Sequence, residues 1–282
     1  MKTLGKDIVV CSLCPHACRL QEGQTGLCAA RTNVGGTIVC TNYGKLTSIA
    51  LDPIEKKPLY HFHPGSVILS VGSYGCNLLC PFCQNHEISR AKAGELRVED
   101  VPPARLAEFA ADTRQRYGNI GVAFTYNEPL VSFEYVRDCA KLLHEKQLAV
   151  VLVTNGQICA EPLEELLPFV DAMNIDLKGF TPAFYDWIGG DLATTKATIA
   201  RAVAAGVHVE VTTLVIPGKN DDEKEMDAEA GWLASISHEI PLHLSRYFPR
   251  YHCEIPVTPV ATLERLQRIA KKYLKYVHLG NV

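Results

Sequence analysis

Residues 67–85 read VILSVGSYGCNLLCPFCQN, and the first six are largely apolar, as in a strand buried on both faces of a parallel sheet. A loop with the spacing C-x3-C-x2-C follows directly and carries Cys76, Cys80 and Cys83. Three thiolates this close together can ligate three irons of a cubane cluster and leave the fourth iron open to another ligand. A structural zinc loop is the alternative, but zinc normally takes four ligands, and the nearest remaining candidate is His86. The stretch therefore predicts an iron–sulfur cluster at the carboxyl end of a strand, where barrel enzymes place their active sites.

Apolar runs of this kind recur along the chain and alternate with segments of helical periodicity. The predicted strands cover residues 67–72, 120–126, 149–154, 173–177, 207–214, 242–247 and, as a seventh candidate, 276–279. Parallel strands joined by right-handed helical crossovers either close into a barrel or stay open. The series predicts an α/β fold, a partial or near-complete TIM-like (β/α)6 barrel with its functional residues at the carboxyl ends of the strands.

The first part of the chain has a different pattern, rich in turns and in cysteine. Residues 37–40 and 46–51 are predicted to pair as a β-hairpin. We therefore divide the chain into a small Cys-rich N-terminal module with a hairpin, residues 1–66, and a core barrel, residues 67–282.

The composition is that of a globular protein: 47% of the 282 residues are hydrophobic, and the net charge is −3. This balance gives no electrostatic reason to expect nucleic acid as a partner. No apolar run approaches the roughly 20 residues that span a bilayer. Residues 1–10 show neither the apolar segment nor the cleavage site of a signal peptide. We therefore expect a cytoplasmic protein with no membrane or nucleic-acid partner.

Cysteine is unevenly distributed, because eight of the 11 cysteines lie within the first 83 residues. Disulfides are not expected in a chain without an export signal, so clustered cysteines indicate metal sites. Cys11, Cys14, Cys18 and Cys28 form the pattern C-x2-C-x3-C-x9-C, with Cys40 as a substitute ligand. Four thiolates can complete a structural zinc site or a closed iron–sulfur cluster. The alternative to this second metal is four reduced thiols in a loosely ordered extension.

The cysteine triad, with Phe82 directly before its third cysteine, resembles the signature of the radical S-adenosylmethionine (SAM) superfamily. The resemblance implies a [4Fe-4S] cluster on Cys76, Cys80 and Cys83, with the methionyl amino and carboxylate groups of SAM on the open iron. It implies reductive cleavage of SAM to a 5'-deoxyadenosyl radical that abstracts hydrogen from a substrate. It also implies a one-electron donor such as flavodoxin or ferredoxin. The cofactor supplies this chemistry, and the protein orients and shields it.

Polar motifs at three further strand ends extend the resemblance. The first resembles a motif of the superfamily, and the other two resemble elements of glycyl-radical-enzyme activases such as pyruvate formate-lyase activating enzyme. The motif Phe-Thr-Tyr-Asn-Glu-Pro stands where a Gly-Gly-Glu motif holds the methionyl amino group, which implies Glu128 as its acceptor and Asn127 as a neighbouring contact. Asn155 belongs to a Thr-Asn-Gly element, and Asp176 and Lys178 belong to an Asp-Leu-Lys element. The resemblance makes Lys178 the cationic partner of the SAM carboxylate and Asp176 an orienting acid. From the residues alone, the first motif could instead cap a helix, and the Asp/Lys pair could lie on the surface.

Motifs outside the core extend the resemblance over nearly the whole chain, to radical SAM enzymes of the AmmeMemoRadiSam system. These motifs are CSLCPHAC at 11–18, DPIEKKPLYHF at 52–62 and HLSRYFP at 243–249. The resemblance implies Memo-like and associated system proteins as partners. It also leads us to expect that relatives continue beyond Val282 into a short tail with further cysteines.

The sequence thus predicts a radical SAM enzyme, with glycyl-radical formation as a candidate reaction. Radical modification of a small molecule or peptide is the alternative among enzymes. A non-catalytic, structural metal-binding protein is the alternative from another class. Charged residues at successive strand ends argue against it, because a structural cluster needs no mouth that binds a cofactor.

Overall fold

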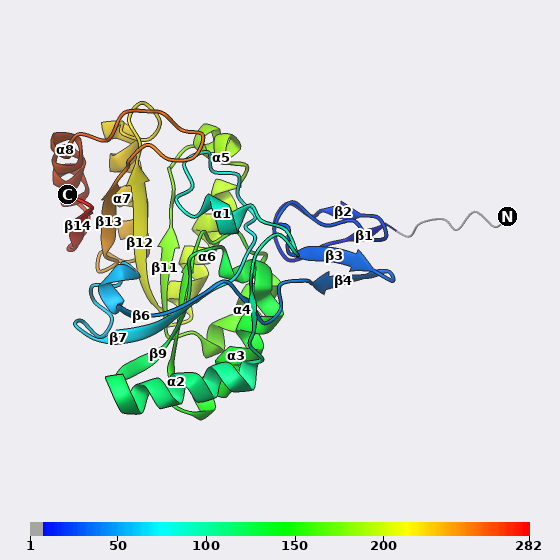
Figure 1. Cartoon of the computed structure of the whole chain (residues 1–282). Coiled ribbons are helices and arrows are strands. Elements are labelled where there is room, and N and C mark those ends of the chain that lie inside the picture. Colours follow the sequence, from blue (N-terminus) through cyan, green and yellow to red (C-terminus); the bar gives the residue numbers. More distant parts are fainter. Residues whose placement is uncertain (1–7) are drawn as a thin grey trace.

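A computed structural model describes residues 8–282 and contains one eight-stranded sheet that runs through the core (Figure 1). Its strands are β6 (Ser48–Pro53), β7 (Val67–Gly72), β9 (Asn119–Phe124), β10 (Ala149–Thr154), β11 (Ala172–Asp176), β12 (His208–Val215), β13 (Leu242–Arg246) and β14 (Val277–Gly280). Their order across the sheet is β14-β13-β12-β11-β10-β9-β7-β6. Neighbours from β7 to β14 are parallel, and β6 runs antiparallel beside β7. Within residues 8–282 the edge strands β14 and β6 do not pair, so the barrel is partial.

The apolar runs of the sequence are the strands of this sheet, and the predicted α/β partial barrel is confirmed. β7 and β10 have the predicted bounds, and the other five strands differ from prediction by one or two residues at an end. The seventh candidate strand is β14. Nearly all residues of β7, β9 and β11 are buried, as expected for parallel strands covered on both faces.

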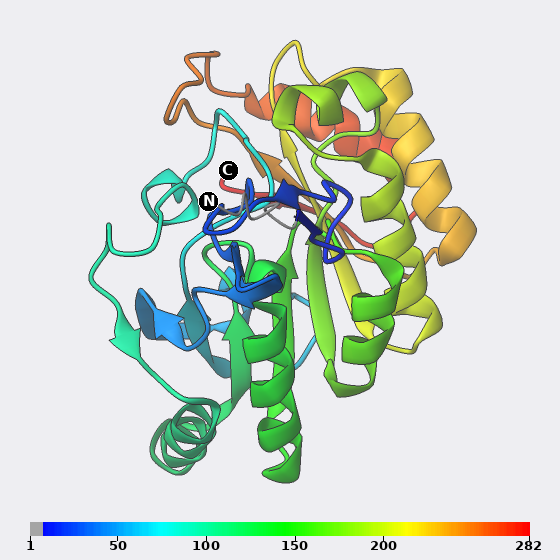
Figure 2. The ribbon, with the colours of Figure 1, turned by 90° about the vertical axis from the view of Figure 1, so that its right-hand side faces the viewer.

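Helices cover one face of the sheet (Figure 2). The longer helices are α2 (Pro103–Tyr117), α3 (Phe133–Glu145), α6 (Leu192–Ala204), α7 (Glu223–Ile236) and α8 (Val260–Ala270), and the shorter ones are α4 (Ala160–Leu166), α5 (Pro182–Ile188) and η3 (Leu167–Phe169). α2 ends at Gly118, whose φ of 71° is the left-handed conformation typical after a helix. α7 follows Asp222, whose side chain accepts the N–H groups of Lys224 and Glu225. No helix of the described residues is long and apolar enough to cross a membrane.

The other face of the sheet is partly covered by the segment that follows β6. Ile54, in the 3-10 helix η1 (Ile54–Lys56), and Leu59 are fully buried. They form one apolar cluster with Ile68, Ala123, Val151 and Ala172. Alternate residues of the same strands pack against the helices instead. The segment therefore fills part of the barrel interior.

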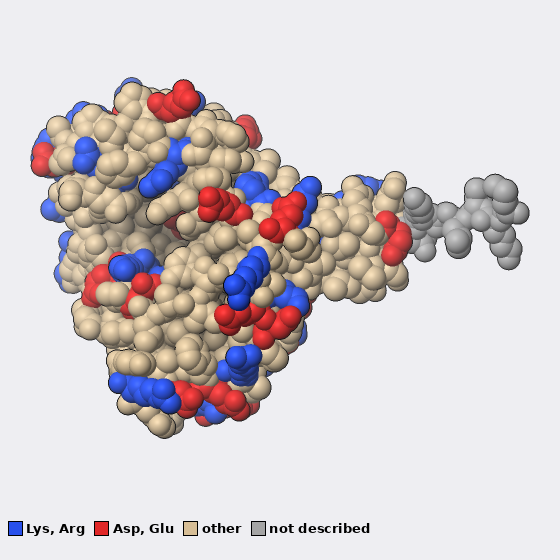
Figure 3. Space-filling model, viewed as in Figure 1, with Lys and Arg blue, Asp and Glu red and all other residues tan. Residues whose placement is uncertain are grey.

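The cysteine-rich N-terminal part projects from the core (Figures 1 and 3). Its strands are β1 (Val9–Val10), β2 (Arg19–Leu20), β3 (Arg31–Val34) and β4 (Thr37–Cys40). β1 pairs with β2 and β3 pairs with β4, both antiparallel. The turn between β3 and β4 is Gly35–Gly36, and both glycines have positive φ, at 61° and 79°. Two such residues are what a tight hairpin turn requires.

The predicted hairpin between residues 37–40 and 46–51 is therefore wrong. β5 (Lys45–Leu46) pairs with β8 (Glu99–Asp100), and β6 is the edge strand of the core sheet. Residues 48–53, which we placed in the N-terminal module, thus lie in the core sheet. The division of the chain near residue 66 otherwise stays a prediction.

Candidate active site

The loop with the three cysteines leaves the carboxyl end of β7 and leads into the short helix α1 (His86–Ser89). The backbone N–H of Leu78 donates to Cys76 Sγ at 3.4 Å, and the Cys83 thiol lies 3.7 Å from Ser89 Oγ. Cys80 lies close enough to both other thiols to interact with them electrostatically. Burial raises the pKa of Cys80 to about 11, so its thiol loses the proton at neutral pH only when a metal binds. The structure thus brings the three predicted ligands to one end of the sheet.

Asn127 holds the backbone of this loop. Its Oδ1 accepts the N–H of Ser73 at 2.9 Å, and its Nδ2 donates to the carbonyls of Tyr74 and Gly75 at 3.1 and 3.0 Å. Both ends of the amide are engaged by main chain, so Asn127 is a positioning residue between β9 and the cysteine loop. Its predicted direct contact with SAM stays a prediction.

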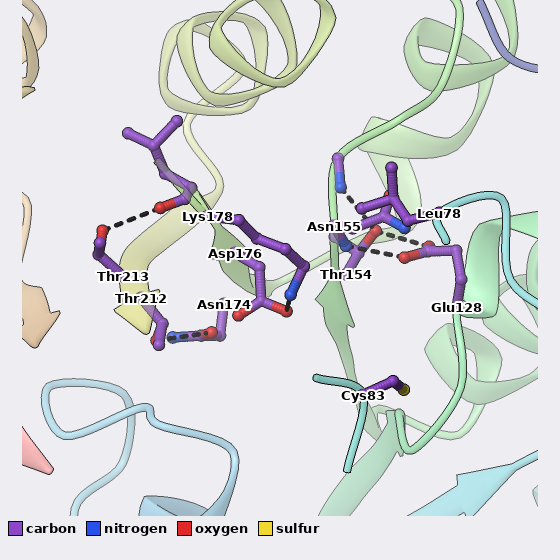
Figure 4. A network of polar contacts seen from close by, with 12 residues as sticks. Leu78, Cys83, Glu128, Thr154, Asn155, Asn174, Asp176, Lys178, Thr212 and Thr213 are labelled. Carbon is purple, nitrogen blue, oxygen red and sulfur yellow. Dashed lines mark hydrogen bonds and ion pairs between the residues drawn. The ribbon is translucent and has the colours of Figure 1, made fainter. Parts of the chain in front are cut away.

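Glu128 joins the ends of two strands through a buried carboxylate (Figure 4). Its Oε1 accepts the N–H of Leu130 at 2.9 Å and the hydroxyl of Thr154 at 2.6 Å, and its Oε2 accepts the N–H of Asn155 at 2.7 Å. The bond from Leu130 caps the 3-10 helix η2 (Pro129–Ser132), so the capping alternative is realised as well. A carboxylate has about four acceptor positions, which leaves one on Oε2 for a ligand. Burial raises the pKa of Glu128 to about 7 despite these donors.

Asn155 connects Glu128 to the cysteine loop. Its Nδ2 lies 3.7 Å from Cys76 Sγ and donates to Asn77 Oδ1 at 2.9 Å. Asn77 in turn donates to the carbonyl of Gln157 at 2.7 Å. Amide donors near a ligating sulfur tune an iron–sulfur cluster, and the Asn155 side chain lies on the cysteine-loop side of the site. Asn77 and Gln157 were not singled out in the sequence, although Asn77 stands inside the cysteine motif itself.

Asp176 and Lys178 form an ion pair at the end of β11 (Figure 4), with Lys178 Nζ 2.9 Å from Asp176 Oδ2. Their side chains are 31% and 17% exposed, so the pair is partly buried at the strand end and does not stand free on the surface. Although burial alone would lower it, Asp176 and the nearby Cys80 hold the pKa of Lys178 above its usual value. Lys178 is therefore a fixed positive charge beside the cysteine loop.

Tyr126 adopts a left-handed backbone conformation, with φ of 72°, where the resembled motif has glycine. Its hydroxyl donates to Asp52 Oδ2 at 2.8 Å. Lys57 Nζ lies 2.9 Å from the same oxygen and 4.7 Å from the centre of the Tyr126 ring. Although burial alone would raise it, Lys57 and Tyr126 hold the pKa of Asp52 well below its ordinary value. The two tertiary contacts stabilise the strained turn that precedes Glu128.

Replacing Tyr126 with phenylalanine will lower the free energy of unfolding by about 1–3 kcal/mol, because the change deletes a hydrogen bond to a nearly buried carboxylate. Chemical unfolding of the two proteins measures the difference. Tyr117→Phe is the matched control: Tyr117 is 61% exposed, and its loss of a hydroxyl should cost less than about 0.5 kcal/mol. A Tyr126→Phe variant as stable as the wild type would show that the Asp52–Lys57 pair needs no third partner.

Deeper in the barrel lies a buried carboxylate that the sequence did not point to. Glu210 of β12 lies 2.9 Å from His208 Nε2 and 2.6 Å from His243 Nε2, and it accepts the backbone N–H of His61 at 2.7 Å. Although burial alone would raise it, these contacts lower the pKa of Glu210 to about 2. Glu210 stands two residues before the β12 partner of Asp176, which is about 7 Å along the strand. The barrel interior is therefore polar between Lys178 and the amino end of β12.

The profile of the radical SAM superfamily matches residues 70–230, more than half of the chain. This chain belongs to the radical SAM superfamily. The matched range runs from β7 into α7. It therefore includes the cysteine triad, Glu128 and the Asp176–Lys178 pair, all of which the geometry gathers at one end of the sheet.

Three proteins illustrate what the chain is similar to. The uncharacterized protein MJ0808 of Methanocaldococcus jannaschii is 38% identical over 282 residues, or 99% of this chain and 83% of that protein. Benzylsuccinate synthase activating enzyme of Thauera aromatica is 27% identical over 202 residues, or 69% of this chain and 58% of that enzyme. A solved domain of pyruvate-formate lyase-activating enzyme from Bacteroides vulgatus shares the fold, with a TM-score of 0.51 and 21% identity over 57% of this chain and 99% of that domain. The predicted superfamily and the likeness to activating enzymes are confirmed, whereas the link to the AmmeMemoRadiSam system stays a prediction.

The residues at the site fit the [4Fe-4S] cluster and the SAM of this superfamily. Cys76 Sγ has the Leu78 N–H and the Asn155 amide beside it, and Lys178 supplies positive charge near Cys80. Donors and cations of this kind stabilise an anionic cluster. Within residues 8–282, no three His, Cys, Asp or Glu side chains are arranged as ligands around one point. Three thiols on one loop, with these partners, nevertheless match the donor set that the cluster needs.

Proposed function

We propose that this protein cleaves SAM reductively at a [4Fe-4S] cluster held by Cys76, Cys80 and Cys83. When bound, the cluster and SAM supply one-electron chemistry that yields a 5'-deoxyadenosyl radical for hydrogen abstraction from a substrate. The observation that carries the proposal is the convergence of the cysteine loop, Glu128 and Lys178 at one end of the sheet. A protein with a merely structural metal would need neither a buried acceptor nor a fixed cation there.

Each residue has a separate task in this proposal. The remaining acceptor position on Glu128 Oε2 suits an N–H of the methionyl amino group. The Lys178 ammonium, held by Asp176, suits the methionyl carboxylate. Asn155 places its amide beside Cys76, and Asn127 fixes the backbone of the cysteine loop.

The proposed reaction is formation of a glycyl radical on a partner protein. Likeness to benzylsuccinate synthase activating enzyme supports this choice. Radical modification of a small molecule or peptide is the second candidate. The same convergence of the cysteine loop, Glu128 and Lys178 supports it equally, because cleavage of SAM is common to both reactions.

Further partners follow from the same proposal. Reductive cleavage of SAM requires a one-electron donor such as flavodoxin or ferredoxin, and the motif resemblance supports Memo-like proteins of the AmmeMemoRadiSam system as partners.

All 11 cysteines are free, which fits a cytoplasmic location. A second metal is proposed at the N-terminal cysteines, which are Cys11, Cys14, Cys18 and Cys28.

The test is reductive cleavage of SAM by the anaerobically reconstituted protein. Reduction with dithionite should give a cluster EPR signal that changes when SAM is added, and 5'-deoxyadenosine should accumulate. Deuterium transfer from a labelled peptide or small molecule into 5'-deoxyadenosine then separates the two substrate classes. An EPR signal indifferent to SAM, with no 5'-deoxyadenosine formed, would contradict the proposed function.

A further inference from the structure

Four cysteines of the N-terminal part line one narrow cavity. Cys11, Cys14, Cys18 and Cys28 all line it. Cys14 lies close enough to Cys11 and Cys28, and Cys28 to Cys11 and Cys18, for the thiols to act on one another electrostatically. The predicted substitute ligand Cys40 is not part of the lining, and its thiol donates instead to Asn42 Oδ1 at 3.1 Å. The structure therefore selects four of the five N-terminal cysteines.

The small size of the cavity favours one of the two metal centres that the sequence left open. Its volume is about 10 Å³, which is room for roughly one water-sized atom. A single tetrahedral ion fits between four thiolates with less rearrangement than a cubane of four irons and four sulfides. Leu13, Leu27 and Val131 complete apolar walls around the thiols. The cavity thus suits a single, water-excluded ion.

Arg31 adds a charge that suits such an ion. Its side chain also lines the cavity and is close enough to Cys28 to act on it electrostatically. A four-thiolate site with one divalent ion carries net negative charge, so a neighbouring cation stabilises it. Arg31 is fixed in place by Glu134, whose Oε1 accepts from Arg31 Nη2 at 2.7 Å.

The cavity adjoins the loop of the SAM cluster. Asn77, the residue after Cys76, is part of its lining, and the backbone carbonyl of Asn77 lies 2.7 Å from His16 Nε2. Gly75 has φ of 91°, and a Cβ at this position would lie 2.4 Å from the carbonyl oxygen of Cys28. The backbones of the two cysteine segments are therefore in direct contact, and only glycine allows it.

The geometry points to a single metal ion, bound by the thiolates of Cys11, Cys14, Cys18 and Cys28, that braces the loop carrying Cys76. The ion site is independent of SAM chemistry, and the bracing rests on the proposed function of that loop. Such an ion would also stabilise the folded N-terminal segment, which has few apolar residues. When a metal site forms only on folding, the free energy of metal binding adds to the free energy of folding. In the described residues, neither the four N-terminal thiols nor those of Cys76, Cys80 and Cys83 are arranged around one point. The open arrangement of the N-terminal thiols therefore does not argue against a metal there, since the triad of the SAM cluster is equally open.

Metal analysis of the full-length Cys76/Cys80/Cys83 triple-alanine variant tests the ion, because this variant lacks the ligands of the SAM cluster. We expect about one zinc per folded chain and no acid-labile sulfide. Adding Cys14→Ser should reduce zinc at least tenfold, whereas Cys40→Ser, in the same part of the chain, should leave it unchanged. A folded triple variant without metal overturns the inference, and so does zinc that survives Cys14→Ser. Iron with acid-labile sulfide would overturn the single ion.

Bracing is tested in the chain with Cys76, Cys80 and Cys83 intact. Cys14→Ser should lower iron at the SAM cluster and the SAM-induced EPR change several-fold, and Cys40→Ser should match the wild type. If Cys14→Ser loses zinc but keeps both cluster iron and the EPR change, bracing is refuted. If the wild type holds zinc but its EPR signal ignores SAM, the proposed function fails and the ion site stands.

Discussion

Replacing Cys80 with alanine will abolish reductive cleavage of SAM while the barrel stays folded. The change removes one of the three protein ligands, so the cluster binds the chain less tightly. A second iron also loses its cysteine, so the cluster no longer has one distinct open iron for SAM. The fold does not depend on this loop, because the apolar core is built from the strands and helices around it. Iron analysis, EPR after reduction and the yield of 5'-deoxyadenosine should all fall to background, with an unchanged far-UV circular dichroism spectrum.

Cys139→Ala is the matched control for this prediction. Cys139 is fully buried in α3 and packs in the apolar core, far along the chain from the cluster loop. Its replacement should cost about 1 kcal/mol of stability and leave iron content and SAM cleavage at wild-type values. If Cys80→Ala kept a SAM-responsive cluster, the cluster would have to sit on other cysteines, and the assignment of the triad would be wrong.

The strands of the core were predictable because burial on both faces leaves a simple mark in the sequence. β7 and β10 are unbroken or nearly unbroken apolar runs, and both were predicted with their observed bounds. β4 carries no such mark: its residues alternate between exposed and half-buried, so neither face specifies a partner. Its true partner β3 was identifiable only from the two glycines between them.

The site was predictable where one motif contains all the residues involved. The cysteine triad lies on one loop, and Asp176 and Lys178 lie two residues apart at the end of β11 and pair with each other. The contact of Tyr126 with Asp52 joins residues 74 positions apart, and nothing in either motif indicates the other. His16 and Asn77 are 61 positions apart, and neither motif indicates that the N-terminal cysteine segment contacts the cluster loop.

Glu128→Ala is expected to weaken SAM binding about 10- to 100-fold while the cluster remains. The change deletes a charge-assisted acceptor, worth about 1.5–3 kcal/mol, and removes no iron ligand. It also frees the buried donors of Thr154 and of the Asn155 backbone, whereas the side-chain amide of Asn155 keeps its bond to Asn77 beside Cys76. A SAM titration of the reduced cluster, followed by EPR, measures the affinity, and iron analysis confirms the cluster.

Glu229→Ala separates this role from a general loosening of the fold. Glu229 of α7 is also fully buried, burial raises its pKa to about 8, and its carboxylate accepts from Thr213 Oγ1 at the side of β12. Both variants should lose stability, but only Glu128→Ala should lose affinity for SAM. Equal weakening in both would assign the effect to packing, and wild-type affinity in Glu128→Ala would remove Glu128 from the binding site.

The pH dependence of SAM binding gives Glu128 a second, independent signature. Burial raises its pKa to about 7, and only the ionised carboxylate is the strong acceptor. Wild-type affinity should therefore rise as the pH increases through about 7, while Glu128→Gln, which has no proton to lose there, should lack this step. The amino group of SAM titrates nearby, at about 8, but it does so equally with both proteins. The difference between the two profiles thus belongs to Glu128, and identical profiles would show that its ionisation plays no part in holding SAM.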